Sequence, residues 1–159
     1  MRTWTNVGAV GVLLAAGLGC PQPVQEATTG ADVEAINEVR EAEMAALNVG
    51  DVEAHLAIMT DDCIVMPPGG EAVVGHEAVR AWSEAFVAMF ELTGEYTGSE
   101  VVVVGDWAIE NYTAALSITP RDGGEAAMET IKGIHVYRRQ ADGSWKIAQD
   151  VWNSDAGPM

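Results

Sequence analysis

The C-terminal segment 143–155 carries the side chains with the clearest chemical meaning in this chain. After the turn at Asp142-Gly143 the residues alternate as in a strand. Asp150 and Trp152 fall on one face, and Trp145, Ile147 and Gln149 fall on the other. A carboxylate beside an aromatic ring on a mostly apolar strand is typical of a strand that lines a pocket. We therefore expect the face with Asp150 and Trp152 to line a ligand site.

A second acidic residue, Glu43, occupies an unexpected position in segment 31–48. On a helical wheel it lies between Ile36 and Val39, with Leu47 close by, at the centre of the apolar stripe. Burying a carboxylate is unfavourable unless the group is paired or protonated. Two interpretations remain open. In the first, Glu43 is accommodated by an internal Arg or Lys or by a small rotation of the helix. In the second, Glu43 is a pocket acid with a raised pKa that can exchange a proton.

These two acids need a scaffold, and the pattern of the chain predicts one of helices followed by strands. Apolar residues recur at helical spacing over residues 31–48, 52–59 and 76–92, and Gly50 is expected to end the first helix. Residues typical of strands fill 63–66, 72–74, 94–104, 107–119, 126–139 and 145–153. Short turns between the long strands imply an antiparallel meander. We therefore expect an α+β fold in which a curved sheet wraps around the helices.

Periodicity does not decide which faces of the two middle strands point inward. One face of segment 107–119 carries Asn111 and Thr113, and the other carries Glu110 and Tyr112. In segment 126–139, Lys132 alternates with His135 in the same way. Because both faces of each strand are mixed, the inward face stays open at this point.

The N-terminal residues predict export. Arg2 precedes an uncharged apolar stretch, Val7–Leu18, which is shorter than the roughly 20 residues needed to span a bilayer but suits a signal peptide core. Residues 16–20, Ala-Gly-Leu-Gly-Cys, resemble the lipobox of bacterial lipoproteins. We expect a signal peptide over 1–19, a lipidated Cys20 opening a flexible tether over 20–30, and membrane attachment through that lipid alone. An ordinary signal peptide cleaved nearby is the alternative.

The remaining residues, 31–159, suffice for one compact domain. Without Arg2 the chain holds seven basic and 24 acidic residues, a net charge near −17, which argues against nucleic acid as a partner. His55, His76 and His135 lack the spacing of metal ligands, and no second cysteine lies near Cys63. We therefore expect no metal site and no other cofactor.

Three segments carry a family resemblance. Residues 47–51, 60–70 and 74–79 look like the nuclear transport factor 2-like superfamily, nearest to its SnoaL-like and ketosteroid isomerase-like branch, and the tail 143–155 is similar to a frequent ending of its small bacterial members. The resemblance covers 31–155. It implies a cone of about three helices packed in a strongly bent, mostly antiparallel sheet, an apolar pocket inside, and usually a homodimer formed through the outer face of the sheet.

The same resemblance speaks against the best-known chemistry of that branch. It puts Glu43 where the isomerases hold their oxyanion tyrosine, Pro67 where they hold the catalytic base, and Ile134 where they hold the protonated oxyanion acid. This chain has none of the three groups at those positions. Ketosteroid isomerisation by the known mechanism is therefore not expected.

The resemblance also selects a pocket face for each strand, and with it a set of site residues. Glu43 and Asp150 become the candidate proton-transfer groups. The candidate ligand-binding residues are Asn111, Thr113, Lys132, Trp152 and Trp82. In the alternative interpretation, Lys132 only neutralises one or both acids in a structural ion cluster.

The function implied is the binding of a small, largely apolar molecule, with general acid-base chemistry of the isomerase, lyase or cyclase kind. The alternative is a module of the cell envelope that dimerises or senses a ligand without catalysis.

Overall fold

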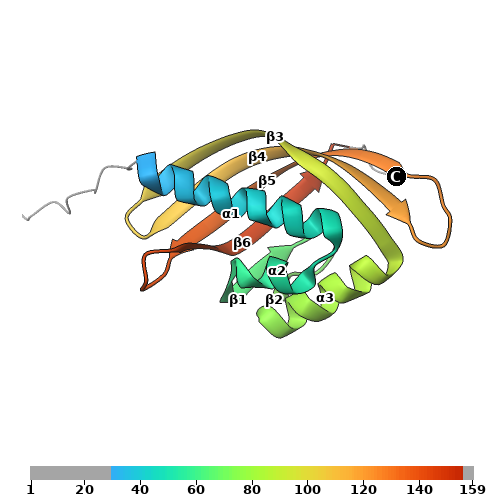
Figure 1. Cartoon of the computed structure of the whole chain (residues 1–159), viewed down its shortest axis with the longest axis horizontal. Helices are drawn as coiled ribbons and strands as arrows, with labels where there is room; N and C mark the ends of the chain where they lie inside the picture. The colour runs from blue at the N-terminus through green and yellow to red at the C-terminus, as the bar shows by residue number, and fades with distance from the viewer. Residues whose placement is uncertain (1–29, 156–159) are drawn as a thin grey trace, which may run out of the picture.

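The computed structural model describes residues 30–155, in which three helices precede most of a six-stranded sheet (Figure 1). The helices are α1 (Gly30–Val49), α2 (Val52–Ala57) and α3 (His76–Met89). The strands are β1 (Met59–Met66), β2 (Val73–Val74), β3 (Phe90–Val104), β4 (Trp107–Pro120), β5 (Ala127–Arg139) and β6 (Trp145–Ser154). The expected signal peptide and Cys20 lie outside the described residues.

The sheet has the strand order β2-β1-β6-β5-β4-β3. The four long strands β3 to β6 form an antiparallel meander, and β1 joins β6 in parallel. Figure 1 shows α1 lying across the sheet, with α2 and α3 near its β1 and β2 end. This α+β arrangement confirms the expected fold class.

Apolar side chains between helices and sheet form two core clusters. The larger joins α1, α2 and α3 to the strands and includes Ile36, Met59, Val79, Tyr137 and Ile147. The smaller consists of Met44, Tyr112, Ala114, Leu116 and Ile131. Trp152 packs partly buried against both clusters, so the C-terminal strand connects them.

A β-bulge in β6 changes the predicted faces of that strand. Val136 pairs with Gln149 but Tyr137 pairs with Ile147, so Ala148 is the extra residue. Ile147 and Ala148 are both buried, and the alternation shifts by one position there. The expectation that Trp145 and Ile147 lie opposite Asp150 is therefore wrong: both sides of the bulge direct their buried residues inward.

The largest differences from the predicted boundaries lie at the junction of α3 and β3 and at the start of β1. Helix α3 ends at Met89 rather than residue 92, because Phe90 is already extended (φ −131°, ψ 152°) and pairs with Pro120. Strand β1 begins at Met59 and includes Asp62, whose carboxylate accepts hydrogen bonds of 3.0 and 2.6 Å from Arg138. The ion pair with Arg138 lets an acidic residue sit within the strand.

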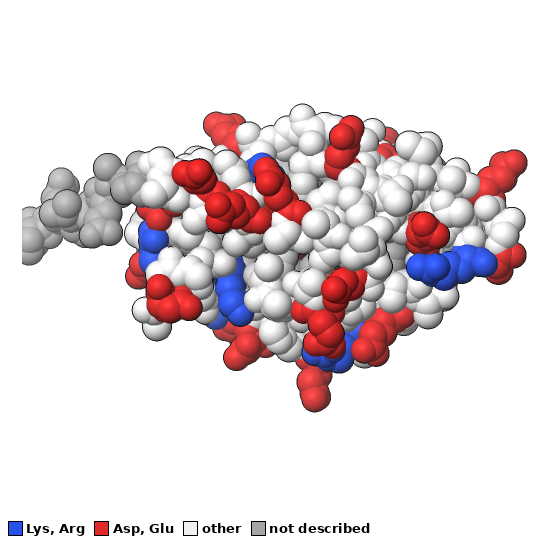
Figure 2. Space-filling model, viewed as in Figure 1, with Lys and Arg blue, Asp and Glu red and all other residues white. Residues whose placement is uncertain are grey.

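Acidic side chains are spread across the face seen in Figure 2, and basic ones are sparse. Among the helices of residues 30–155, none is long and apolar enough to cross a membrane.

Candidate functional site

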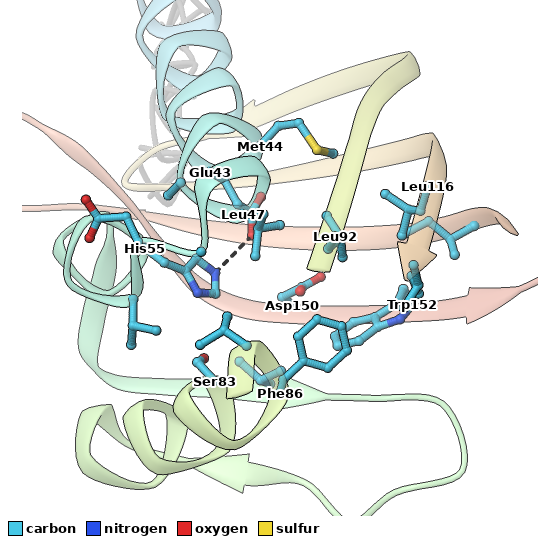
Figure 3. A pocket seen from close by; sticks show the side chains of 18 of the residues that line it. Glu43, Met44, Leu47, His55, Ser83, Phe86, Leu92, Leu116, Asp150 and Trp152 are labelled. Carbon is cyan, nitrogen blue, oxygen red and sulfur yellow. Dashed lines mark ion pairs between the residues drawn. The ribbon is translucent and has the colours of Figure 1, made fainter. Parts of the chain in front are cut away.

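A cavity of about 160 Å³ lies between the three helices and the inner face of the sheet. Most of its wall is apolar. Figure 3 shows side chains from α1, α3, β3, β4 and β6 converging on it, among them Met44, Leu47, Phe86, Leu92, Leu116 and Trp152. Trp82 also lines it and meets the Trp152 ring edge-on, with ring centroids 6.2 Å apart.

One end of this cavity is polar. Glu43 from α1, His55 from α2 and Asp150 from β6 all reach it, and Figure 3 marks the ion pair that joins Glu43 and His55. The Nε2 atom of His55 lies 3.6 Å from Oε1 of Glu43. The side chains of Glu43 and His55 are 2% and 8% exposed. Groups able to carry protons thus gather where water has little access.

A second histidine, His135 on β5, joins the two acids from behind. Its Nε2 lies 3.3 Å from a Glu43 oxygen and 3.3 Å from an Asp150 oxygen, and its Nδ1 lies 3.0 Å from Glu110 Oε2. Burial alone would lower the pKa of His135, but the surrounding carboxylates raise that pKa well above its usual value. The surrounding carboxylates therefore favour the imidazolium form of the ring in the metal-free chain.

Glu110 on β4 anchors the far side of the His135 ring. Its carboxylate accepts hydrogen bonds from Arg40 Nη1 at 2.8 Å, Ser99 Oγ at 2.5 Å and the Tyr137 hydroxyl at 2.5 Å. Burial favours a higher pKa for Glu110, but the hydrogen bonds from His135, Ser99, Tyr137 and Arg40 prevail and lower the pKa to about 2. Glu110 is therefore a fixed negative charge.

Two tyrosines hold the cavity acids in place. Tyr96 donates its hydroxyl hydrogen to Glu43 at 2.6 Å, and Tyr112 donates to Asp150 at 2.9 Å. Burial and the nearby carboxylates raise the pKa of both phenols, which keeps their protons in place. For Glu43, burial raises the pKa, but the two histidines and Tyr96 outweigh it and lower the pKa.

Of the two interpretations left open for Glu43, the one with a raised pKa does not agree with the lowered pKa, and the one with an internal partner holds with a different kind of partner. Histidines meet Glu43, where the sequence suggested an Arg or a Lys. The proton-transfer roles expected of Glu43 and Asp150 stay predictions, since the geometry shows their position and not their reactivity.

The structure reverses the predicted face of β4 and β5. Asn111, Thr113 and Lys132 are exposed on the outer face, where Lys132 Nζ pairs with Asp155 at 2.5 Å. Ile134, the neighbour of Asn111 across the strands, is 38% exposed on the same face. The inward orientation carried over from the family resemblance is therefore wrong for these residues, because their alternate neighbours, and not they, pack under α1.

Of the predicted site residues, four lie together at the cavity: Glu43, Asp150, Trp82 and Trp152. Sequence reasoning missed His55, Tyr96 and the buried His135 network. A usable signal existed in the strand register. Glu110 pairs with His135, and His135 pairs with Asp150, so three ionisable residues form one row across β4, β5 and β6.

The cluster can act in two ways. Glu43, Asp150 and His55 face the cavity and can exchange protons with a bound molecule. Glu43, His135 and Asp150 also offer three ligand atoms that lie within 4.8 Å of one another, a separation that suits a metal ion.

Comparisons with known proteins place this site in a family context. The family model described as the SnoaL-like domain matches residues 41–148. A ketosteroid isomerase-like protein from Erwinia carotovora atroseptica shares 22% identity and a TM-score of 0.72, over 80% of this chain and 99% of that one. A conserved protein from Planctomyces limnophilus shares 26% identity and a TM-score of 0.69, over 79% and 99%.

A third solved structure, a proposed dehydratase of the NTF2-like family from Streptomyces avermitilis, shares 23% identity and a TM-score of 0.70, over 80% of this chain and 98% of that one. A search of curated proteins found no match. The family model spans more than half of the chain and includes Glu43, His55, Glu110 and His135. The chain belongs to the SnoaL-like domain family.

Proposed function

We propose that this protein binds a small, largely apolar molecule in the cavity and transfers protons on it, in an isomerase- or dehydratase-like reaction. One observation carries the proposal: buried acid-base groups stand at the polar end of an otherwise apolar cavity. The cavity volume of about 160 Å³ is close to that of an engineered cavity, about 150 Å³, that binds benzene. A molecule with a single ring fits that space.

Each group has a distinct role in this proposal. Glu43 and Asp150 face the cavity and serve as proton acceptors, and His55 exchanges a proton beside Glu43. His135 does not line the cavity and acts as a positioning residue that holds both carboxylates in place. Ser83 lines the cavity with a buried hydroxyl that has no hydrogen-bond partner among the described residues, so it is available to a polar group of the ligand.

The names of two similar structures suggested the reaction class. One is an isomerase-like protein and the other a proposed dehydratase, and both kinds of reaction include the removal of a proton. Their identities, below 25%, speak for the fold alone.

The test uses 2-cyclohexen-1-one, a six-membered ring with a polar carbonyl and exchangeable C–H protons. Proton NMR in deuterated buffer follows binding through chemical shifts and chemistry through loss of the C–H signals. We expect the protein to accelerate exchange, and Glu43→Gln and Asp150→Asn to slow it by about 100-fold, the lower end of general acid-base contributions. Asn111→Ala, on the outer face, should leave the exchange rate unchanged.

A pair of tryptophan substitutions checks that the cavity is the binding site. Ile118 lines the cavity, whereas Met128 is 74% exposed nearby on the neighbouring strand. Ile118→Trp should abolish the ligand-induced shifts, and Met128→Trp should preserve them. Saturable binding without exchange would replace catalysis by the ligand-sensing alternative. Absence of saturable binding to the unmodified protein would count against both.

We also propose that the protein works outside the cytoplasm, held to a membrane by lipid on Cys20. The apolar stretch Val7–Leu18 and the small residues before Cys20 support this location. Cys20→Ser should move the protein from the membrane fraction to the soluble fraction. An unchanged membrane fraction would contradict the lipid anchor.

A homodimer through the outer face of the sheet is the third part of the proposal. Large apolar side chains are exposed there on adjacent strands, namely Val102, Val104, Trp107, Ile109 and Ile134. Val102→Glu should shift the protein to a monomer in sedimentation equilibrium. Val74→Glu, at a comparably exposed valine on β2, is the matched control and should leave the dimer intact. A monomeric unmodified chain would refute this part.

A further inference from the structure

We infer that Glu43, His135 and Asp150 form a binding site for a divalent transition-metal ion of the Zn²⁺ kind. Each side chain offers one ligand atom, and these atoms lie within 4.8 Å of one another. The residues come from α1, β5 and β6, so they converge only in the folded chain. The spacing of histidines along the sequence, from which no metal site was expected, cannot reveal a set of one histidine and two carboxylates from three elements.

The distances from His135 to the two carboxylates match a shared ion. Nε2 of His135 lies 3.3 Å from Oε2 of Glu43 and 3.3 Å from Oδ1 of Asp150. Nitrogen and oxygen ligands bind Zn²⁺ at about 2.1 Å, which places two tetrahedral ligands roughly 3.4 Å apart. The observed separations therefore leave room for one ion at ordinary bond lengths.

The bonding of His135 supports the same conclusion. Its Nε2 is fully buried and makes no aligned hydrogen bond within residues 30–155, although two carboxylate oxygens lie close to it. A buried polar atom that lacks an aligned hydrogen bond is uncommon and calls for an explanation. A metal ion bound to Nε2 and to both carboxylates provides one.

The groups behind the ligands are those that metal sites use. Nδ1 of His135 faces Glu110 at 3.0 Å, and donation of its hydrogen there leaves the Nε2 lone pair for an ion. Tyr96 and Tyr112 donate hydrogen bonds to Glu43 and Asp150 and so orient the ligating carboxylates. Such outer partners tune affinity by about 10- to 100-fold.

Charge favours a divalent ion as well. The carboxylates of Glu43, Glu110 and Asp150 carry three negative charges, and Arg40, bound to Glu110 at 2.8 Å, carries one positive charge. With His135 neutral, a divalent ion brings the sum to zero. One nitrogen and two oxygen ligands suit Zn²⁺, Mn²⁺ or Fe²⁺ better than Ca²⁺, which takes six to eight oxygen ligands.

A fourth coordination position would face the cavity, because Glu43 and Asp150 line it. Three protein ligands with one open position are typical of catalytic rather than structural zinc sites. Binding of the ion does not depend on the proposed function, which assigns the proton-accepting roles to Glu43 and Asp150 in the metal-free chain, and it can be measured without any organic ligand.

The test is isothermal titration calorimetry of the full chain, stripped with EDTA and dialysed, with Zn²⁺ as the titrant. We expect one saturable site per chain. Asp150→Asn and Glu43→Gln, which preserve side-chain shape, should weaken binding by about 100-fold or more, and Glu110→Gln by about 10- to 100-fold. Circular dichroism establishes that each variant is folded.

The matched control is His76→Gln. His76 is a partly exposed histidine with Asp61 4.0 Å away, so it reports adventitious surface binding, and its loss should change nothing. Nitrogen NMR of the unmodified chain gives a second readout that needs no variant: saturating Zn²⁺ should remove one N–H of His135. Absence of one-to-one binding, equal loss in His76→Gln, or a His135 that keeps both protons would overturn the inference. Failure here would leave the cyclohexenone result untouched.

Discussion

The two faces of strands β4 and β5 differ more than their sequences suggest. On the inner face Glu110 and His135 are fully buried and share hydrogen bonds with Tyr137. One residue away along each strand, Asn111 and Ile134 lie on the outer face in contact with solvent. Neighbours in sequence therefore have opposite surroundings.

This difference determines how much an ionisable group contributes to stability and to the chemistry of the site. The exposed pair of Lys132 and Asp155 is screened by water and contributes little to stability. The buried charges compensate one another, so removing one leaves its partners as uncompensated buried charges. A charged residue on the inner face is thus constrained in position and protonation, as a functional group must be.

The comparison is tested most strongly by removing Glu110. Glu110→Ala leaves His135 and Arg40 buried without their shared carboxylate and should lower the free energy of unfolding by about 3–5 kcal/mol. Urea denaturation measures the change. Glu100→Ala, at an exposed glutamate on the outer part of β3, should stay within about 0.5 kcal/mol. Equal losses would erase the distinction between buried and exposed acids.

The buried charges should make the stability of the protein fall at both acidic and alkaline pH. The pKa of Glu110 falls from 4.5 to about 2 on folding, so its contribution of about 3 kcal/mol is present above pH 4.5 and lost as pH falls through 2. In the metal-free chain the pKa of His135 is raised, so its contribution is complete below its ordinary value of 6.5 and is lost as pH rises through the raised value.

Urea denaturation over a pH series checks both limbs. His135→Gln should flatten the alkaline limb, whereas Glu100→Ala should retain both. An alkaline limb that survives in His135→Gln would assign the loss to other groups.

Two glycines, one on each face, test how tightly the two faces are packed. A Cβ atom on Gly133 would lie 2.5 Å from the Tyr112 hydroxyl and 2.6 Å from the Val151 carbonyl oxygen, so Gly133→Ala should cost about 1–3 kcal/mol and displace Tyr112 from Asp150. At Gly98 the neighbour is only the Thr113 hydroxyl, at 2.9 Å. Gly98→Ala should therefore cost less in the same thermal unfolding series. A larger loss of stability for Gly98→Ala than for Gly133→Ala would show that the inner face is not tightly packed at Gly133.

The smallest effect is expected at Lys132. Lys132→Ala removes an exposed ion pair and should change the free energy of unfolding by less than about 1 kcal/mol, with no effect on ligand exchange or Zn²⁺ binding. Chemical denaturation and the two binding assays check this. A large loss of stability, of ligand exchange or of Zn²⁺ binding would show that Lys132 does contribute to the site.

The sequence predicted the scaffold better than the site. Helical spacing and turn residues located all three helices and the long strands to within a few residues, and the wheel position of Glu43 identified a buried acid. Asp150 and Trp152 were also placed on the correct face. The choice between Lys132 and His135 failed, because both faces of β5 carry a mixture of polar and apolar residues.

Sequence patterns predicted local features: the period of each segment, the turns, the helical stripe around Glu43, and the strand face that Asp150 and Trp152 share. Features that depend on distant segments required the folded chain. The bulge at Ala148 shifted the phase of β6, and the packing of α1 selected the inner face of β4 and β5. The row of Glu110, His135 and Asp150 exists only across three strands, because strand register and not sequence distance brings ionisable groups together.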